Sequence, residues 1–168
     1  QDWVKNLFIL PALVFSLPTL TEADRGELLP TWIADTVIVV AAFSLLASGF
    51  YAINDALDAE RDRLHPRKRR RPIAAGRISP GTGIRFGVVL ILGGVTAGFL
   101  VDPAVGGVLV GYLVLQVLYN GGLKRVAIAD AVVLATGFAM RATVGAFAID
   151  RAVSTDRKST RLNSSHAN

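Results

Sequence analysis

The stretch WIADTVIVVAAFSLLASGFYAI, residues 32–53, decides the fold class. About 20 predominantly apolar residues cross the hydrocarbon core of a bilayer as an α-helix, so this stretch is long enough to span it. The segment NDALDAERD, residues 54–62, follows directly and contains four acidic residues. The sequence therefore predicts a membrane-spanning helix whose end carries a cluster of carboxylates.

The composition of the whole chain agrees with a membrane protein. Hydrophobic residues make up 52% of the 168 positions, more than a soluble domain of this size needs. The net charge of +5 is typical of some nucleic-acid-binding proteins, but the basic residues are concentrated in one stretch between apolar runs. We therefore expect one basic loop and no nucleic-acid partner. The absence of cysteine excludes zinc fingers and cysteine nucleophiles.

The apolar runs predict an all-α fold, a polytopic transmembrane helix bundle. Five spans are expected, at residues 4–20, 32–53, 84–101, 103–119 and 128–149, of which the first and fourth are short. Lysine and arginine are densest in the loop 54–79, and the positive-inside rule therefore places this loop and the N-terminus in the cytoplasm. The connection 21–31 and the turn at Asp102 are then expected outside.

Pairs of glycines at small-xxx-small spacing lie within two of the predicted spans. They are Gly94 with Gly98, and Gly107 with Gly111. This spacing lets the backbones of neighbouring helices approach closely. We interpret both pairs as helix-packing positions.

Three carboxylates in the acidic segment share one helix face. Asp55, Asp58 and Asp62 are spaced by three and four residues, so they fall within about 60° of one another on a helix. Clustered carboxylates repel one another unless a cation is present, and Mg2+ commonly joins one or two carboxylates to substrate phosphates. The segment therefore predicts a catalytic Mg2+ site at these three aspartates, beside the amide of Asn54. The alternative is a solvated, charged helix end.

A basic rim follows the acidic cluster. It comprises residues 67–71 and Arg77, and includes Lys68 and Arg71. Cations beside a metal site suit a diphosphate, whose far oxygens need positive partners. Part of this charge also serves the positive-inside rule or attracts anionic lipid.

Two further regions contribute candidate site residues. Tyr119 and Lys124 lie at the next expected cytoplasmic loop. Arg141 lies inside the fifth predicted span, where burial of a charge is expensive and indicates function. The alternative for Arg141 is that its side chain reaches the outer interface.

The segment RKSTRLNSSHAN, residues 157–168, differs from everything before it. It is polar and without periodicity, and we expect a non-native or disordered tail after a domain formed by residues 1–156. A natural polar tail is the alternative.

These motifs together resemble a known family. The pattern NDxxDxxxD at 54–62, followed by RPIAAGRIS at 71–79, resembles the first signature of the UbiA superfamily of intramembrane transferases. WVKN at 3–6, the Tyr119-xxxx-Lys124 pair and GFxxR at 137–141 support the resemblance. The form HPRKRxRPIA at 65–74 resembles most the branch that acts on polyprenyl phosphates, the decaprenyl-phosphate phosphoribosyltransferases.

The resemblance implies a fold and an activity. The family fold has about nine spans, and its second aspartate-rich signature lies in a later loop that this sequence does not contain, so we expect the chain alone to be inactive. The implied reaction is the Mg2+-dependent transfer of phosphoribose from phosphoribosyl diphosphate to decaprenyl or another polyprenyl phosphate, in cell-wall arabinan precursor synthesis at a bacterial plasma membrane. The implied substrate contacts are Asn54, Lys68, Arg71, Arg77, Tyr119, Lys124 and Arg141.

Two alternatives stay open at this point. The same metal-diphosphate site could serve prenyl transfer from an allylic diphosphate to an aromatic or other acceptor. Outside enzymes, a membrane scaffold whose basic loop binds anionic lipid would use the arginines but not the aspartates.

Overall fold

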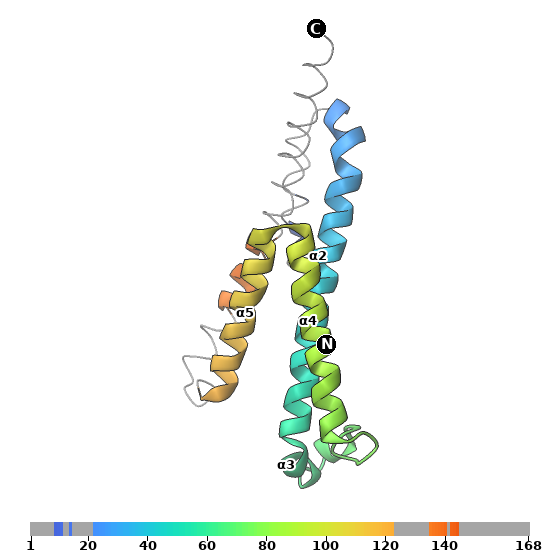
Figure 1. Ribbon diagram of the computed structural model, residues 1–168, viewed down its shortest axis with the longest axis vertical. Helices are drawn as coiled ribbons and strands as arrows, with labels where there is room; N and C mark the ends of the chain where they lie inside the picture. Colours follow the sequence, from blue (N-terminus) through green and yellow to red (C-terminus); the bar gives the residue numbers. More distant parts are fainter. Residues whose placement is uncertain (1–8, 12–13, 15–21, 123–134, 141, 145–168) are drawn as a thin grey trace.

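The computed structural model describes residues 9–11, 14, 22–122, 135–140 and 142–144, and this part of the chain is all-helical. Its elements are α2 (Glu22–Leu57), α3 (Ala59–Arg63), the short 3-10 turn η3 (Lys68–Arg70), α4 (Pro80–Val101) and α5 (Pro103–Gly121). Figure 1 shows the three long helices, with α3 at the end of α2.

Three helices in the described region are long and apolar enough to cross a membrane. They cover Leu29–Leu57, Pro80–Val101 and Pro103–Gly121, which confirms helices at the predicted spans 32–53, 84–101 and 103–119. The predicted spans 4–20 and 128–149 lie mostly outside the described residues. The tail 157–168 lies entirely outside them.

Helix α2 is longer at both ends than the predicted span. It begins at Glu22, so nearly all of the expected connection 21–31 is helical, with Pro30 inside the helix. It also runs on to Leu57, so the first residues of the expected loop 54–79 are helical too. Hydropathy marks only the part of a helix that suits lipid, and the polar ends that continue it are missed for that reason.

Helices α2 and α4 lie side by side and touch through glycines (Figure 1). A Cβ atom added at Gly87 would lie 2.6 Å from the carbonyl oxygen of Gly49, and one added at Gly94 would lie 2.6 Å from the carbonyl oxygen of Ala42. Only glycine permits backbones to approach this closely. The packing role predicted for Gly94 is confirmed, whereas the contact between Gly49 and Gly87 was not predicted.

A tight turn joins α4 to α5. Asp102 ends α4 and caps α5, because its Oδ1 accepts a hydrogen bond of 2.7 Å from the backbone N–H of Ala104. Across the turn, Gly98 of α4 lies against the side chain of Leu109 of α5, as the packing role of Gly98 predicts. In the described part of the chain, Gly111 contacts Met140 loosely, and nothing lies within 4 Å of a Cβ placed at Gly107.

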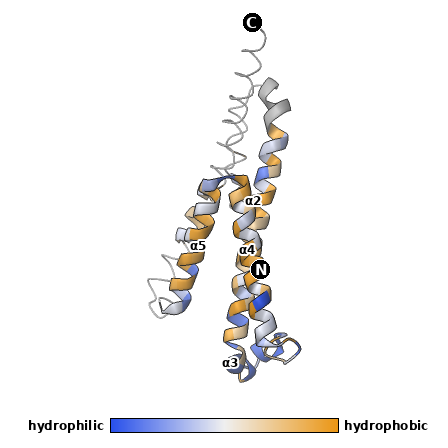
Figure 2. Cartoon of the chain, viewed as in Figure 1, coloured by the Kyte–Doolittle hydropathy of each residue, from blue (hydrophilic) through white to orange (hydrophobic). Residues whose placement is uncertain are grey.

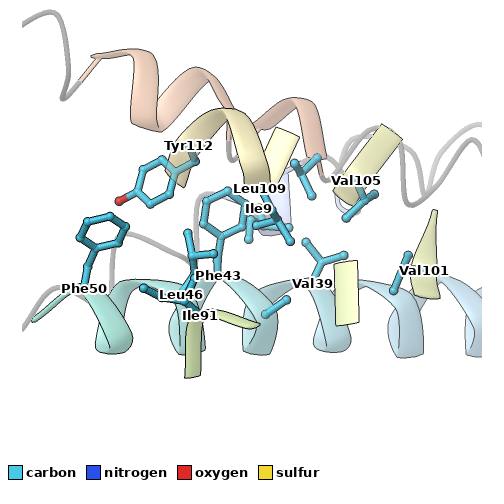
Figure 3. Packing of buried hydrophobic residues seen from close by; sticks show 12 residues of the cluster. Ile9, Val39, Phe43, Leu46, Phe50, Ile91, Val101, Val105, Leu109 and Tyr112 are labelled. Atoms are coloured by element: carbon cyan, nitrogen blue, oxygen red, sulfur yellow. The ribbon is translucent and has the colours of Figure 1, made fainter. Parts of the chain in front are cut away.

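A small apolar core lies where the three long helices meet. Figure 3 shows Phe43 and Phe50 of α2 facing Leu109 and Tyr112 of α5. The rings of Phe43 and Tyr112 meet edge to face, with centroids 5.3 Å apart. The outer faces remain apolar, as a lipid-facing bundle requires, whereas polar residues collect around α3 (Figure 2). The described region is therefore an apolar bundle with a polar end.

Candidate functional site

The acidic segment crosses the junction of α2 and α3 as a nearly continuous helical run. The backbone N–H of Asp58 donates to the carbonyl of Asn54 at 2.9 Å, and that of Asp62 donates to the carbonyl of Asp58 at 2.8 Å. Asp58 itself leaves helical geometry, with φ −90° and ψ 3°. Asp55 and Asp62 are seven residues apart, so they share a helix face to within about 20°.

One guanidinium nitrogen joins these two aspartates. Arg71 Nη1 donates to Oδ1 of Asp55 at 2.7 Å and to Oδ2 of Asp62 at 2.9 Å. Lys68 Nζ lies 3.7 Å from the other oxygen of Asp62. The Asp62 side chain is only 2% exposed, and a carboxylate buried to this degree needs such cationic partners. Asp55 and Asp62 of the acidic face therefore form one cluster with Lys68 and Arg71 of the basic rim.

The residue after Arg71 explains how its side chain reaches the aspartates. Pro72 disfavours helical geometry at the residue before it, and Arg71 is extended, with φ −61° and ψ 143°. The preceding turn is organised by His65, whose ring Nδ1 accepts from the backbone N–H groups of Arg67 at 3.2 Å and Lys68 at 3.4 Å. The turn η3 therefore ends at Arg71, whose side chain points back to the aspartates of α2 and α3.

An apolar contact anchors the segment that follows Arg71. Ile73 is buried against Ala56 and Ala59, and Ala74 beside it is buried as well. A Cβ added at Gly83 would lie 2.5 Å from the Ile73 side chain, so this glycine of α4 leaves the space that Ile73 fills. Sequence reasoning missed this anchor, although the pair Gly83 and Gly87 has the same small-xxx-small spacing as the pairs that it did find.

Arg63 fastens the same segment from the side of α3. Its Nε donates to the carbonyl of Ala74 at 3.2 Å, while its Nη1 pairs with Glu60 at 2.8 Å. The backbone N–H of Arg77 donates to the carbonyl of Pro72 at 2.9 Å and closes the loop. Arg63 was not predicted as a site residue, because nothing in a run of arginines marks the one that binds a distant carbonyl group.

Asp58, the third predicted metal ligand, does not join the Arg71 cluster. Its side chain is 41% exposed, and Nη1 of Arg61 lies 3.9 Å from its Oδ1. On a helix it lies about 60° from Asp55 and about 40° from Asp62, and its own backbone leaves helical geometry at the junction of α2 and α3. Within the described residues, no three His, Asp or Glu side chains gather closely enough to hold a metal ion together.

Of the other predicted substrate contacts, three lie within the described residues and two lie outside them. Asn54 is half-buried next to Asp55, and Arg77 is exposed and pairs with no carboxylate that the structure describes. Tyr119 is half-buried in the last turn of α5, whose end lies apart from α3 in Figure 1. Lys124 and Arg141 lie outside the described residues.

The donor set fits Mg2+ held by two carboxylates. Oxygens of Asp55 and Asp62 bond the same nitrogen atom, and so they are close enough to share a cation. Mg2+ typically takes one or two carboxylates and completes its shell with waters and substrate phosphates. The geometry therefore suits a metal that arrives with a phosphate-bearing ligand.

An apolar bundle with an acidic and basic cluster at one end defines a polytopic integral membrane protein with a polar site at the end of its helices. Residues 10–161 match the UbiA prenyltransferase family, and the chain belongs to that family. The match reaches five residues into the segment expected to be a foreign or disordered tail.

Several curated relatives are decaprenyl-phosphate phosphoribosyltransferases. The chain is 33% identical over 150 residues to the one from Mycolicibacterium smegmatis, covering 89% of this chain and 46% of that protein. It is 34% identical over 148 residues to the Mycobacterium tuberculosis protein, covering 88% and 48%. For the Corynebacterium glutamicum protein the identity is 37% over 150 residues, covering 88% and 43%. The chain thus spans less than half the length of each of these relatives.

Proposed function

We propose that this chain supplies the donor-diphosphate site of a Mg2+-dependent membrane transferase. The donor is phosphoribosyl diphosphate, and the acceptor is a polyprenyl phosphate such as decaprenyl phosphate, in the synthesis of a cell-wall arabinan precursor. The observation that carries the proposal is the convergence of Asp55 and Asp62 on Arg71, beside Lys68, at the polar end of an apolar bundle. The names of the phosphoribosyltransferase relatives favour this donor.

Each group of the cluster has a role in this proposal. Asp55 and Asp62 hold the metal ion against the donor, with Asn54 beside them as a ligand or positioning group. When bound, Mg2+ neutralises the diphosphate and favours its departure. Lys68 and Arg71 bind the outer diphosphate oxygens and stabilise the charge that develops as the bond to ribose breaks.

The reaction exchanges one carbon–oxygen bond for another. A phosphate oxygen of the lipid forms a bond to the anomeric carbon of the ribose, and the bond from that carbon to the diphosphate breaks. The diphosphate leaves with the electron pair. The products are a polyprenyl phosphoribose and free diphosphate, and no oxidant or reductant is needed.

The rest of the predicted site belongs to the same proposal. Arg77, Tyr119, Lys124 and Arg141 are further substrate contacts, and Asp58 is an additional acidic group at the mouth of the site. We place the segment 54–79 and the N-terminus on the cytoplasmic side of a bacterial plasma membrane, following the positive-inside rule. A second acidic segment from the remainder of the full-length protein completes the metal site, so this chain alone does not turn over substrate.

Prenyl transfer is the second candidate, favoured by the description of the family itself. The same aspartates would then hold the diphosphate of an allylic donor, and an aromatic or other acceptor would capture the prenyl cation. The two reactions place the same demands on the acidic and basic cluster. Only the donor and acceptor distinguish them.

Direct comparison of donors tests the proposal. Membranes containing the full-length protein are given radiolabelled phosphoribosyl diphosphate or a radiolabelled allylic diphosphate, each with Mg2+ and decaprenyl phosphate. We expect label from the phosphoribosyl donor in the lipid fraction, and we expect chelation of divalent cations to remove it. Membranes lacking the protein are the control. Label from the allylic donor alone would favour the second candidate, and label from neither would reject both.

A further inference from the structure

Arg71 is the shared counter-ion of two acidic groups that belong to different helices. A single nitrogen bonds both carboxylates, at 2.7 Å to Asp55 of α2 and at 2.9 Å to Asp62 of α3. Any divalent cation that binds these two oxygens must compete with Arg71 for them. Any phosphate that binds Arg71 must compete with the two aspartates.

We propose that Arg71 makes the binding of the divalent cation and the binding of the diphosphate depend on each other. This inference rests on the proposed function, because it assigns both ligands to this cluster. Arg71 acts as a coupling residue: when both ligands bind, its guanidinium group releases the two carboxylates to the cation and binds the diphosphate instead.

The charges explain why one ligand alone binds poorly. A metal ion alone displaces the guanidinium group from Asp55 and Asp62 and leaves it without an anionic partner. A diphosphate alone draws Arg71 away and leaves Asp62, whose side chain is 2% exposed, with only the more distant Lys68. With both ligands present, the metal satisfies the carboxylates and the diphosphate satisfies Arg71. Each ligand therefore raises the affinity of the other by the same factor.

The exchange requires movement of one side chain and not of the loop. Ile73 and Ala74, which follow Arg71 closely, are buried, and Arg63 binds the carbonyl of Ala74. The Arg71 side chain is 42% exposed, so its guanidinium group can reach a ligand in the surrounding solvent. The anchored backbone keeps that group within reach of both the aspartates and the diphosphate.

Double-label equilibrium dialysis measures this coupling without measuring activity. The full-length protein in lipid nanodiscs is dialysed against radioactive Mn2+, with and without radioactive inorganic diphosphate, at equal free Mn2+. For the wild type we expect diphosphate to tighten Mn2+ binding by about tenfold or more, within the usual range of coupling between sites.

Replacement of the shared cation separates coupling from simple loss of structure. Arg71→Gln is expected to bind Mn2+ alone several-fold more tightly than the wild type, to bind diphosphate more weakly, and to lose most of the tightening. Arg71→Lys, which keeps one positive charge, should retain part of the coupling. Arg85→Gln, at an exposed position of α4 outside the basic rim, is the matched control and should behave as the wild type.

The outcomes distinguish this inference from the proposed function. If Arg71→Gln binds Mn2+ alone no more tightly than the wild type, or keeps the full tightening by diphosphate, then Arg71 only holds the loop and the inference is wrong. If Asp62→Asn leaves Mn2+ binding unchanged, the metal site itself is wrong and both proposals fall. Loss of Mn2+ binding in Asp62→Asn with unchanged binding in Arg71→Gln rejects only the coupling role.

Discussion

Asp58 and Asp62 lie one helical turn apart, but their surroundings differ. Asp62 is almost fully buried, between Arg71 at 2.9 Å and Lys68 at 3.7 Å, whereas Asp58 is 41% exposed and lies 3.9 Å from Arg61. Under the proposed function, a carboxylate that converges with Asp55 can share the metal ion with it, whereas one directed elsewhere cannot. The two aspartates should therefore contribute unequally to catalysis.

We expect Asp62→Asn to lower kcat/KM for the donor by about a hundredfold or more, the size of effect produced by removing a principal electrostatic group from an active site. Asp58→Asn should have a several-fold effect, because its oxygen does not join the pair. Steady-state transfer by the full-length protein at saturating lipid acceptor measures both. Glu60→Gln, which alters only an exposed pair with Arg63, is the control. Equal losses at Asp58 and Asp62 would contradict the two-carboxylate geometry.

The sequence pointed to the acidic and basic residues that converge in the structure, Asp55, Asp62, Lys68 and Arg71, but not to how they pair. The spacing of Asp55 and Asp62 follows from helix periodicity, and the basic rim was visible as composition. The bond from Arg71 to Asp55 joins residues 16 positions apart across a loop, and it depends on Pro72 and on the burial of Ile73. No local pattern specifies such a contact, so Arg71 was predicted as a substrate contact without its acidic partners.

At the scale of helices, the interface of α2 and α4 depends on glycine at points of backbone contact. Gly49 and Gly87 each leave no room for a Cβ, because the carbonyl oxygen of the other lies in its place. Gly93, on the exposed side of α4, has open space around it. The hydropathy pattern identified these helices, but it could not tell which glycines lie in the interface.

We expect Gly87→Ala to destabilise the folded protein by about 1–3 kcal/mol, the usual cost of overpacking, because the helices must move apart to admit the methyl group. Gly93→Ala should be neutral or slightly stabilising, since alanine favours a helix more than glycine does. Thermal unfolding of both variants in one detergent, compared with the wild type, gives the difference. An equal effect of the two substitutions would mean that α2 and α4 do not meet at Gly87.

At the scale of the whole molecule, the site lies at the polar end of α2 and continues into a segment held against α4. Ile73 fills the space over Gly83, so helix packing and the position of Arg71 depend on each other. The described region brings two aspartates of the acidic segment together with Lys68 and Arg71 of the basic rim. Membership of the family and the spans 32–53, 84–101 and 103–119 could be predicted from the sequence. The placement of Lys124 and Arg141 remains a prediction.

The central claim is that Asp55 and Asp62 hold a metal-bound diphosphate, and phosphorus hyperfine coupling to Mn2+ tests it most directly. Full-length protein in nanodiscs is loaded with Mn2+ and inorganic diphosphate, and free complexes are removed before electron-nuclear double resonance is recorded. We predict a phosphorus coupling in the wild type and in Glu60→Gln, and a clear fall in coupled Mn2+ per protein in Asp62→Asn. An unchanged amount of coupled Mn2+ in Asp62→Asn would contradict the claim.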